Sequence, residues 1–258
     1  MLKNERLQRI LEWVNKRGLI TVHEIVAELD VSDMTVRRDL DELEKAGKLI
    51  RVHGGAQSIE NNQNYEKSNT EKLTQQMAEK EEIADLALPL IQDNETIFFG
   101  PGTTLECLAR KVLDRNLRII TNSLPVFNIL MTSPTIDVIL IGGKYRDITG
   151  SFIGSLANQS IKSIKCSKVF VSANAIYKDL ISTYSETEGK TQQLSIDSAI
   201  DKYLLADHTK FGKYDFYPFY STSRFDKILS DSGLPDDVKE MYSNYTEIVT
   251  PQTPTDDD

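Results

Sequence analysis

The segment "GPGTTLECLARKVL" combines glycines, hydroxyl side chains and the start of a helical pattern, which together can hold a phosphate group. Gly100 and Gly102 let the backbone approach a ligand, and the hydroxyls of Thr103 and Thr104 can donate hydrogen bonds. The N-terminus of the helix that follows favours negative charge. We therefore expect a phosphate here, with a simple turn into a helix as the alternative.

Other polar residues follow further short apolar runs, at positions where strands are expected to end. Donors and charges of this kind suit a phosphorylated polyol or sugar. A local ion pair between Asp207 and Lys210 that orders a loop is the alternative for those two. Lys72 and Lys80 lie where a polar segment meets the large domain, and they either touch the ligand or stay solvated. The candidate ligand-binding residues added in this way are Thr121, Asn122, Gly142, Gly143, Arg146, Asn174, Asp207, Lys210, Lys72 and Lys80.

A second kind of chemistry is indicated by "VSDMTVRRDLDELEKAG", where two arginines stand side by side near the start of a predicted helix. A short turn and then a capped helix with exposed arginines is the arrangement that enters the major groove of DNA. The alternative is that both arginines are solvated partners of neighbouring carboxylates. The expected contacts to DNA are Ser32, Met34, Thr35, Arg37 and Arg38.

The next segment, "KLIRVHGGA", alternates apolar and basic residues and ends in two glycines. This pattern predicts a strand and a tight turn, which we call the wing. A basic wing can lie along a phosphate backbone, so Arg51 and His53 are expected to contact it.

Two amphipathic helices are expected before the arginine-bearing helix. "NERLQRILEWVNKRG" repeats apolar residues at i, i+3, i+4 and i+7 from Leu7 and meets a helix stop at Gly18. "TVHEIVAEL" starts with Thr21 and has Glu24 three residues later, a capping-box signature. Residues 1–57 therefore predict a winged helix-turn-helix domain.

The rest of the chain has the pattern of an α/β domain. Residues 58–72 are polar and nearly free of aliphatic side chains, which predicts a linker. Residues 73–250 alternate a helix and short apolar runs, the pattern of parallel strands covered on both faces. The acidic segment 251–258 is expected to be a disordered tail. The runs that predict strands are "TIFFG", "LRIITN", "DVILIGG", "KVFVSAN" and "KYLLADH".

Charge and cysteine content limit the classes of protein. The 258 residues contain 30 Lys plus Arg and 39 Asp plus Glu, but residues 1–57 hold 10 of each sign, so the whole acidic excess follows residue 57. The N-terminal part must therefore bind nucleic acid through local patches. Cys107 and Cys166 suggest neither a disulfide framework nor a paired metal motif. No apolar run approaches the roughly 20 residues that cross a bilayer, so we expect a cytoplasmic protein. We also expect no metal and no cofactor.

The stretch "SDMTVRRDLDELEKAGKLIRVHGGA" resembles the winged helix-turn-helix signature of the DeoR-type family of bacterial transcription regulators, and the resemblance extends over nearly the whole chain. It implies an oligomeric repressor of operator DNA whose C-terminal, sugar-phosphate-isomerase-like domain senses a phosphorylated sugar. Carried over residue by residue, it implies an effector site at Gly102–Thr104, Thr121, Asn122, Gly142, Gly143, Arg146, Asp207 and Lys210.

The chain departs from the family pattern at two places. Gly100 and Pro101 stand where most members have an acidic and then a small residue, and "SANAI", with Asn174, replaces a glycine-rich segment around an aspartate. These differences indicate a subgroup and disfavour catalysis, because isomerisation needs a base on the substrate carbons. Glu186 and Glu188, expected in a surface loop, are the remaining acids. We therefore expect no catalytic residue, with a phosphosugar isomerase as the alternative.

Overall fold

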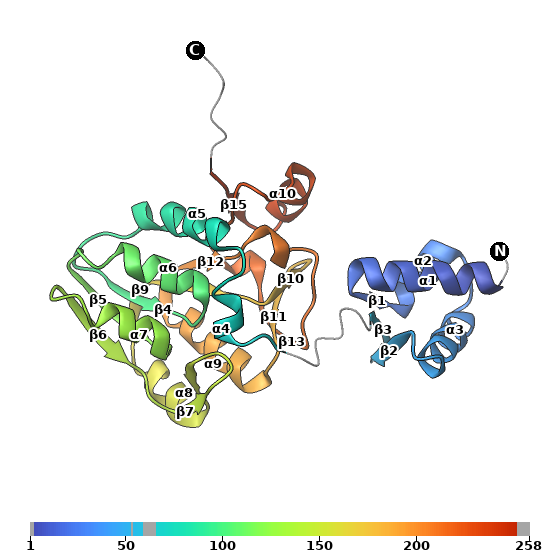
Figure 1. Ribbon diagram of the computed structural model, residues 1–258, viewed down its shortest axis with the longest axis horizontal. Helices are drawn as coiled ribbons and strands as arrows, with labels where there is room; N and C mark the ends of the chain where they lie inside the picture. Colours follow the sequence, from blue (N-terminus) through green and yellow to red (C-terminus); the bar gives the residue numbers. More distant parts are fainter. Residues whose placement is uncertain (1–2, 53, 59–65, 252–258) are drawn as a thin grey trace, which may run out of the picture. The chain divides into compact units, whose positions relative to one another are not determined.

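The computed structural model describes residues 3–52, 54–58 and 66–251 (Figure 1). The chain forms two compact units: a small unit of residues 1–66 with 212–214, and a large unit of the remainder. Of the sequence predictions, His53, most of the linker and nearly all of the tail fall outside the described residues. Both ends of the segment predicted to be a linker have regular secondary structure: Ser58 ends a strand, and residues 69–72 form a helical turn.

The small unit contains the three predicted helices and the wing. Thr21 and Glu24 form the predicted capping box, since the Thr21 side chain accepts from the Glu24 N–H and the Glu24 carboxylate accepts from the Thr21 N–H. A short strand that was not predicted adds to the wing, so that an antiparallel sheet of order β1-β3-β2 results. The elements are α1 (Lys3–Arg17), β1 (Leu19–Thr21), α2 (Val22–Leu29), α3 (Asp33–Lys45), β2 (Leu49–Val52) and β3 (Gly55–Ser58).

The large unit is built on a parallel sheet of seven strands in the order β15-β14-β12-β9-β4-β5-β6. All five predicted strands are present as its central members and one edge. Two three-residue strands at the other edge were not predicted, because such short segments have no long apolar run. The strands are β4 (Thr96–Phe99), β5 (Leu117–Thr121), β6 (Ile136–Leu140), β9 (Cys166–Ser172), β12 (Ala199–Leu205), β14 (Lys227–Leu229) and β15 (Glu247–Val249).

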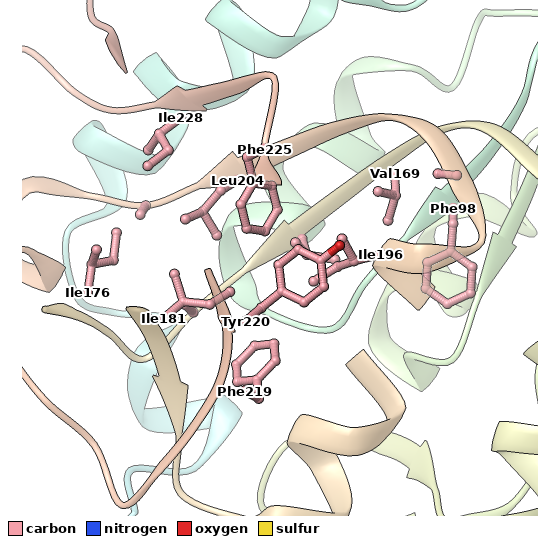
Figure 2. Close-up of a cluster of buried hydrophobic side chains, with 14 of the residues drawn as sticks. Phe98, Val169, Ile176, Ile181, Ile196, Leu204, Phe219, Tyr220, Phe225 and Ile228 are labelled. Atoms are coloured by element: carbon pink, nitrogen blue, oxygen red, sulfur yellow. The ribbon is translucent and has the colours of Figure 1, made fainter. Parts of the chain in front are cut away.

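Helices cover both faces of this sheet. Phe98 and Phe99 are neighbours on β4 and point to opposite faces, and they belong to different apolar clusters. The Phe99 cluster includes residues of α5 (Met77–Ala87), α6 (Thr103–Lys111) and α7 (Leu124–Leu130). The Phe98 cluster, shown in Figure 2, includes residues of α8 (Ser155–Lys162), α9 (Glu186–Asp197) and α10 (Asp236–Ser243). The apolar runs are therefore buried on both sides, as predicted.

Smaller elements complete the large unit. The antiparallel strands β10, β11 and β13 form a second sheet, and β7 pairs with β8 in a hairpin. Helix α9 replaces the surface loop expected around Glu186 and Glu188. The bounds are α4 (Asn69–Lys72), η1 (Leu88–Leu90), β7 (Lys144–Arg146), β8 (Ser151–Ile153), β10 (Ala175–Tyr177), β11 (Leu180–Thr183), η2 (His208–Lys210), β13 (Tyr217–Ser221) and η3 (Thr222–Arg224).

Candidate functional sites

The N-terminal end of α3 presents most of the residues predicted to read DNA. Ser32 caps the helix, because its Oγ accepts from the N–H of Thr35 at 3.3 Å. The two hydroxyls also lie 2.8 Å apart and share a hydrogen bond. Met34 is 75% exposed, which is unusual for an apolar side chain on a helix whose other apolar residues are buried. Its exposure at this end fits contact with a thymine methyl group.

The two arginines of α3 have different environments. Arg37 is exposed and pairs with Asp33 one turn earlier, with 2.5 Å between Nε and Oδ1. Asp33 raises the pKa of Arg37 through this hydrogen bond. Arg38 is also exposed and has no ion-pair or hydrogen-bond partner among the described residues. The solvated-partner alternative therefore describes Arg37, whereas Arg38 is available for a phosphate or a base edge.

A buried ion pair orients α3. Arg6 on α1 holds Asp39 on α3 with both ends of its guanidinium, Nε to Oδ2 at 2.5 Å and Nη2 to Oδ1 at 3.1 Å. Both side chains are largely buried, and Asp39 raises the pKa of Arg6. Such a two-point contact fixes direction as well as distance. The exposed face of α3 is thereby fixed relative to α1.

The wing residue Arg51 turns toward α3 instead of standing free. Its Nε lies 3.5 Å from Oδ1 of Asp41, and the Arg51 side chain is only 20% exposed. Its Nη1 is buried and has no partner within the described chain.

In the large unit, a pocket opens where the strand order reverses. The chain runs from β4 outward to β5 and β6, then returns to β9 on the other side of β4. Ligands in open α/β sheets bind at such switch points, beyond the carboxyl ends of the strands. The pocket is lined by Asn69, Lys72, Gln75, Gln76, Lys80, Pro101, Gly102, Thr103, Thr104, Thr149, Ser172, Ala173, Asn174, Thr183, Glu188, Gln192, Leu205, Ala206, Asp207, Thr209 and Lys210.

The Gly-Thr-Thr segment forms one wall of this pocket. Gly102 has φ +133°, and a Cβ there would stand 2.4 Å from Ser172 Oγ, so the position requires glycine. In the described structure no side chain caps α6 at Gly102. The first N–H groups of α6 are therefore left for another acceptor, beside the hydroxyls of Thr103 and Thr104.

Three lysines also line the pocket, two from the segment before β4 and one that follows β12. Lys72 Nζ donates to Asn174 Oδ1 at 3.0 Å. Lys80 is 4% exposed, and its Nζ donates to the carbonyl oxygens of Lys72 and Gln75 at 2.6 and 2.5 Å. Burial lowers the pKa of Lys80, and the charge of Asp207 opposes this effect. The structure thus brings together the predicted residues Lys72, Lys80, Asn174, Asp207 and Lys210.

Asp207 makes the local contacts considered from the sequence, and it also lines the pocket. It caps η2, because its Oδ1 accepts from the N–H and the hydroxyl of Thr209. Its Oδ2 lies 3.8 Å from Lys210 Nζ. The carboxylate therefore orders the loop, and it also holds Lys210 at the pocket.

Three predicted residues lie away from the pocket lining because they support β4 and β5. A Cβ at Gly100 would stand 3.1 Å from Val171 Cγ1, so this glycine permits close packing on β9. Thr121 Oγ1 accepts from the Ser123 N–H, and Asn122 Nδ2 donates to the Phe152 carbonyl. Strand β5 follows β4 on the side away from β9, so its carboxyl end is one strand removed from the switch point.

The predicted residues after β6 also lie outside the lining. Gly143 permits close packing, since a Cβ there would meet the Ile153 carbonyl at 2.9 Å, while Gly142 has no described atom within 4 Å of such a Cβ. Arg146 stands behind the wall. Its Nη1 lies 3.4 Å from Thr149 Oγ1 and 3.8 Å from Glu188 Oε2, and both of these partners line the pocket.

Sequence reasoning missed the polar residues that come from turns and from α9. The signal from strand ends does not include most of them, because only Ser172 and Thr209 lie at or just after the end of a parallel strand. Glu188 was considered only as part of a surface loop, yet it is 2% exposed and lies in the first turn of α9. The missed polar lining residues are Asn69, Gln75, Gln76, Thr149, Ser172, Thr183, Glu188, Gln192 and Thr209.

The residues that the structure describes contain neither a metal-binding cluster nor a membrane-spanning helix. No group of three or more His, Cys, Asp or Glu side chains in them could hold a metal ion. None of the helices in those ranges has the length and apolar character needed to span a membrane.

A winged helix-turn-helix with an open arginine face, followed by an α/β domain with a cationic pocket, defines a ligand-sensing transcription regulator. Residues 6–62 match the DeoR-like helix-turn-helix domain, and residues 75–232 match the DeoR C terminal sensor domain. The chain belongs to the DeoR family.

Relatives are similar to the chain over nearly its whole length. It is 48% identical to the lactose phosphotransferase system repressor of Lactococcus lactis subsp. lactis, over 96% of this chain and 99% of that protein. It is 47% identical to the protein of the same name from Staphylococcus aureus (strain NCTC 8325 / PS 47), over 96% and 100%. Among solved structures, ribose 5-phosphate isomerase A from Methanocaldococcus jannaschii matches with a TM-score of 0.39 and 14% identity, over 51% of this chain and 53% of that chain.

Proposed function

We propose that this protein represses genes for lactose uptake and for the tagatose 6-phosphate pathway, and that a phosphorylated sugar releases it from operator DNA. Tagatose 6-phosphate is the leading candidate for the effector. The observation that carries the proposal is the pocket at the switch point, where an uncapped helix N-terminus meets three lysines. The likeness to lactose phosphotransferase system repressors supports the choice of pathway.

The charge of the pocket suits a sugar phosphate. Lys72, Lys80 and Lys210 supply three cations against the carboxylates of Asp207 and Glu188. The N–H groups at the start of α6 and the hydroxyls of Thr103 and Thr104 supply donors without further charge. A phosphate dianion that enters this wall gains charge-assisted hydrogen bonds.

The segment that links the effector to the DNA-binding unit is itself a wall of the pocket. The large unit starts at Lys67, and Asn69 already lines the pocket. Asn69 Nδ2 donates to Glu106 Oε1 at 2.7 Å, and Figure 1 shows α4 close to α6. Lys80 holds the carbonyls of Lys72 and Gln75. A ligand that takes over one of these cations must rearrange the segment through which the chain leaves the large unit.

This arrangement favours a population shift as the mechanism of release. A homodimer or homotetramer binds palindromic or repeated half-sites of double-stranded DNA through α3, with Arg38 as the principal reader. The sugar phosphate favours an arrangement of the small units that does not fit the operator. Moving from nearly all bound to nearly none requires about 5 kcal/mol of differential effector affinity.

Two alternatives differ from this proposal in testable ways. Another phosphorylated sugar, such as fructose 1-phosphate, is the closer one, since the same cations would hold its phosphate. A phosphosugar isomerase is the more distant one, and the buried carboxylate of Glu188 is the observation in its favour. Turnover of an aldose phosphate would support the enzyme.

The deciding experiment is fluorescence anisotropy of the protein on its own upstream promoter DNA, titrated with tagatose 6-phosphate and, in parallel, fructose 1-phosphate. Release by the tagatose ester alone is the expected result. Tight binding that neither sugar weakens would retain the repressor and reject the effector. Absence of specific DNA binding would reject the repressor.

A further inference from the structure

The pocket wall formed by α9 has chemistry that a phosphate does not need. Glu188 and Gln192 lie one helical turn apart, are 2% and 7% exposed, and both line the pocket. Thr183 Oγ1 donates to Glu188 Oε2 at 3.0 Å, and Arg146 Nη1 stands 3.8 Å from the same oxygen. The carboxylate is thus held in place from β11 and β7. Negative charge on this wall repels a phosphate.

Gln192 shows that this wall is incomplete without a ligand. Its Oε1 is buried and has no hydrogen-bond partner in the part of the chain that the structure describes. A buried acceptor without a donor destabilises the free protein, so an apolar side chain of similar shape would serve the fold better. A ligand hydroxyl can either donate to the amide oxygen of this side chain or accept from its nitrogen.

The wall at the start of α6 and the wall formed by α9 therefore differ in the chemical groups that they can bind. The oxygens of a phosphate dianion only accept hydrogen bonds, so they match the N–H groups of α6 and the lysine ammonium groups. Sugar hydroxyls both donate and accept, so they match a carboxylate and an amide. One ligand that carries both kinds of group would fill the pocket.

We propose that Glu188 and Gln192 bind the hydroxyl groups of the sugar and determine which phosphorylated sugar the protein senses. This inference rests on the proposed function, because it takes the pocket to be the effector site. An epimer that turns its hydroxyl away leaves Gln192 unpaired again. Sites built to pair a buried polar group discriminate strongly for that reason, whereas charge on a phosphate distinguishes no epimers.

The test is isothermal titration calorimetry on the full chain with three ligands: tagatose 6-phosphate, its C4 epimer fructose 6-phosphate, and inorganic phosphate. Gln192→Met removes the amide and keeps the length of the side chain. Gln193→Met is the matched control, because Gln193 is half-buried on the same helix and does not line the pocket.

In Gln192→Met we expect affinity for the preferred sugar ester to fall tenfold or more, affinity for phosphate to stay within twofold, and the ratio between epimers to approach one. Gln193→Met should behave as wild type. Glu188→Gln, which removes the charge, should weaken the sugar ester and leave affinity for phosphate unchanged or higher. Lys210→Ala should weaken both ligands together.

Thermal denaturation separates this role from a structural one. Gln192→Met without ligand should melt at the wild-type temperature or above it, because the change removes an unpaired buried acceptor. The inference is overturned if Gln192→Met and Glu188→Gln lose affinity for the sugar ester and for phosphate equally, or if neither change alters the ratio between epimers. Binding of the sugar ester by the wild-type protein would still uphold the proposed function in that case. If wild type binds neither ester, the proposed function fails as well.

Discussion

At the scale of single residues, each candidate site contains cations that differ in their surroundings. Arg37 shares its charge with Asp33, whereas Arg38, beside it on α3, has no partner in the described residues. In the pocket, Lys80 is buried against backbone carbonyls, whereas Lys210 is held by Asp207. Residue type alone does not distinguish a reader of DNA from a surface ion pair; the partner does.

Arg38→Ala should abolish specific operator binding and leave sugar-phosphate binding intact. A bidentate contact from arginine to guanine contributes about 1–3 kcal/mol of discrimination. If Arg38 contacts a phosphate instead, affinity falls for every DNA sequence and the salt slope decreases by about one. Anisotropy titrations at several salt concentrations measure both quantities.

Lys45→Ala is the matched control, since Lys45 is an exposed cation at the other end of α3. Operator affinity that survives in Arg38→Ala with an unchanged salt slope would contradict the assignment of α3 as the reading helix.

We expect Lys80 to make effector binding sensitive to alkaline pH. Burial is the main cause of its lowered pKa, so Lys80 loses its proton before an ordinary lysine does. Affinity for a sugar phosphate should therefore fall as pH rises through this lowered pKa. Calorimetric titration from neutral pH to pH about 10, close to the pKa of an ordinary lysine, measures the fall in affinity. In Lys80→Arg, whose side chain stays charged, the fall should disappear.

Without ligand, the contribution of Lys80 to stability should change with pH in the opposite direction to effector affinity. The unfolded chain holds the Lys80 proton more tightly than the folded one, so unfolding takes up protons between the two pKa values. The Lys80 contribution to the free energy of unfolding therefore increases with pH in that range and is smallest below the folded pKa. If the free energy of unfolding of the wild type depends on pH in the same way as that of Lys80→Met, burial does not destabilise the charged lysine.

At the scale of elements, the loop between β4 and α6 shapes the pocket wall that we propose binds the phosphate. Gly102→Ala introduces a Cβ at 2.4 Å from Ser172 Oγ and at φ +133°, so the loop must move. We expect at least tenfold weaker binding of sugar phosphate, with stability reduced by about 1–3 kcal/mol, the usual cost of a strained backbone conformation. Calorimetry and thermal denaturation measure these two changes.

Gly142→Ala is the control, because no described atom lies within 4 Å of the added Cβ. Its effector affinity should equal that of wild type. A loss there, with Gly102→Ala unaffected, would move the effector site to the end of β6, where sequence reasoning had also looked.

Sequence patterns predicted the elements well and the pocket only in part. Apolar runs identify buried strands such as β4 and β9, and the rule that ligands bind at strand ends then indicates Gly102 and Asp207. The same rule indicates Thr121 as well, because a sequence does not reveal the order of strands in the sheet, and only that order defines the switch point. Gln192 follows no strand, and its burial depends on how α9 packs.

At the scale of the whole molecule, the proposed mechanism requires that both ligands act on one equilibrium. The chain segment between the two units starts from a pocket wall in which Lys72 binds Asn174 and Lys80 binds the Lys72 carbonyl. In the proposed mechanism a sugar phosphate changes these contacts, and the operator favours the arrangement in which they are intact. Because coupling free energy is reciprocal, each ligand must weaken the other by the same factor.

Operator DNA should therefore lower the affinity for sugar phosphate by the factor by which sugar phosphate lowers the affinity for operator. For a complete switch this factor approaches about 10⁴. Calorimetry with and without saturating operator duplex gives one factor, and anisotropy with and without sugar gives the other. In Arg38→Ala, added operator should leave sugar affinity unchanged, because the DNA no longer binds. Unequal factors in wild type would mean that the sugar acts outside this equilibrium, for instance by changing the oligomeric state, and would separate the pocket from the release of DNA.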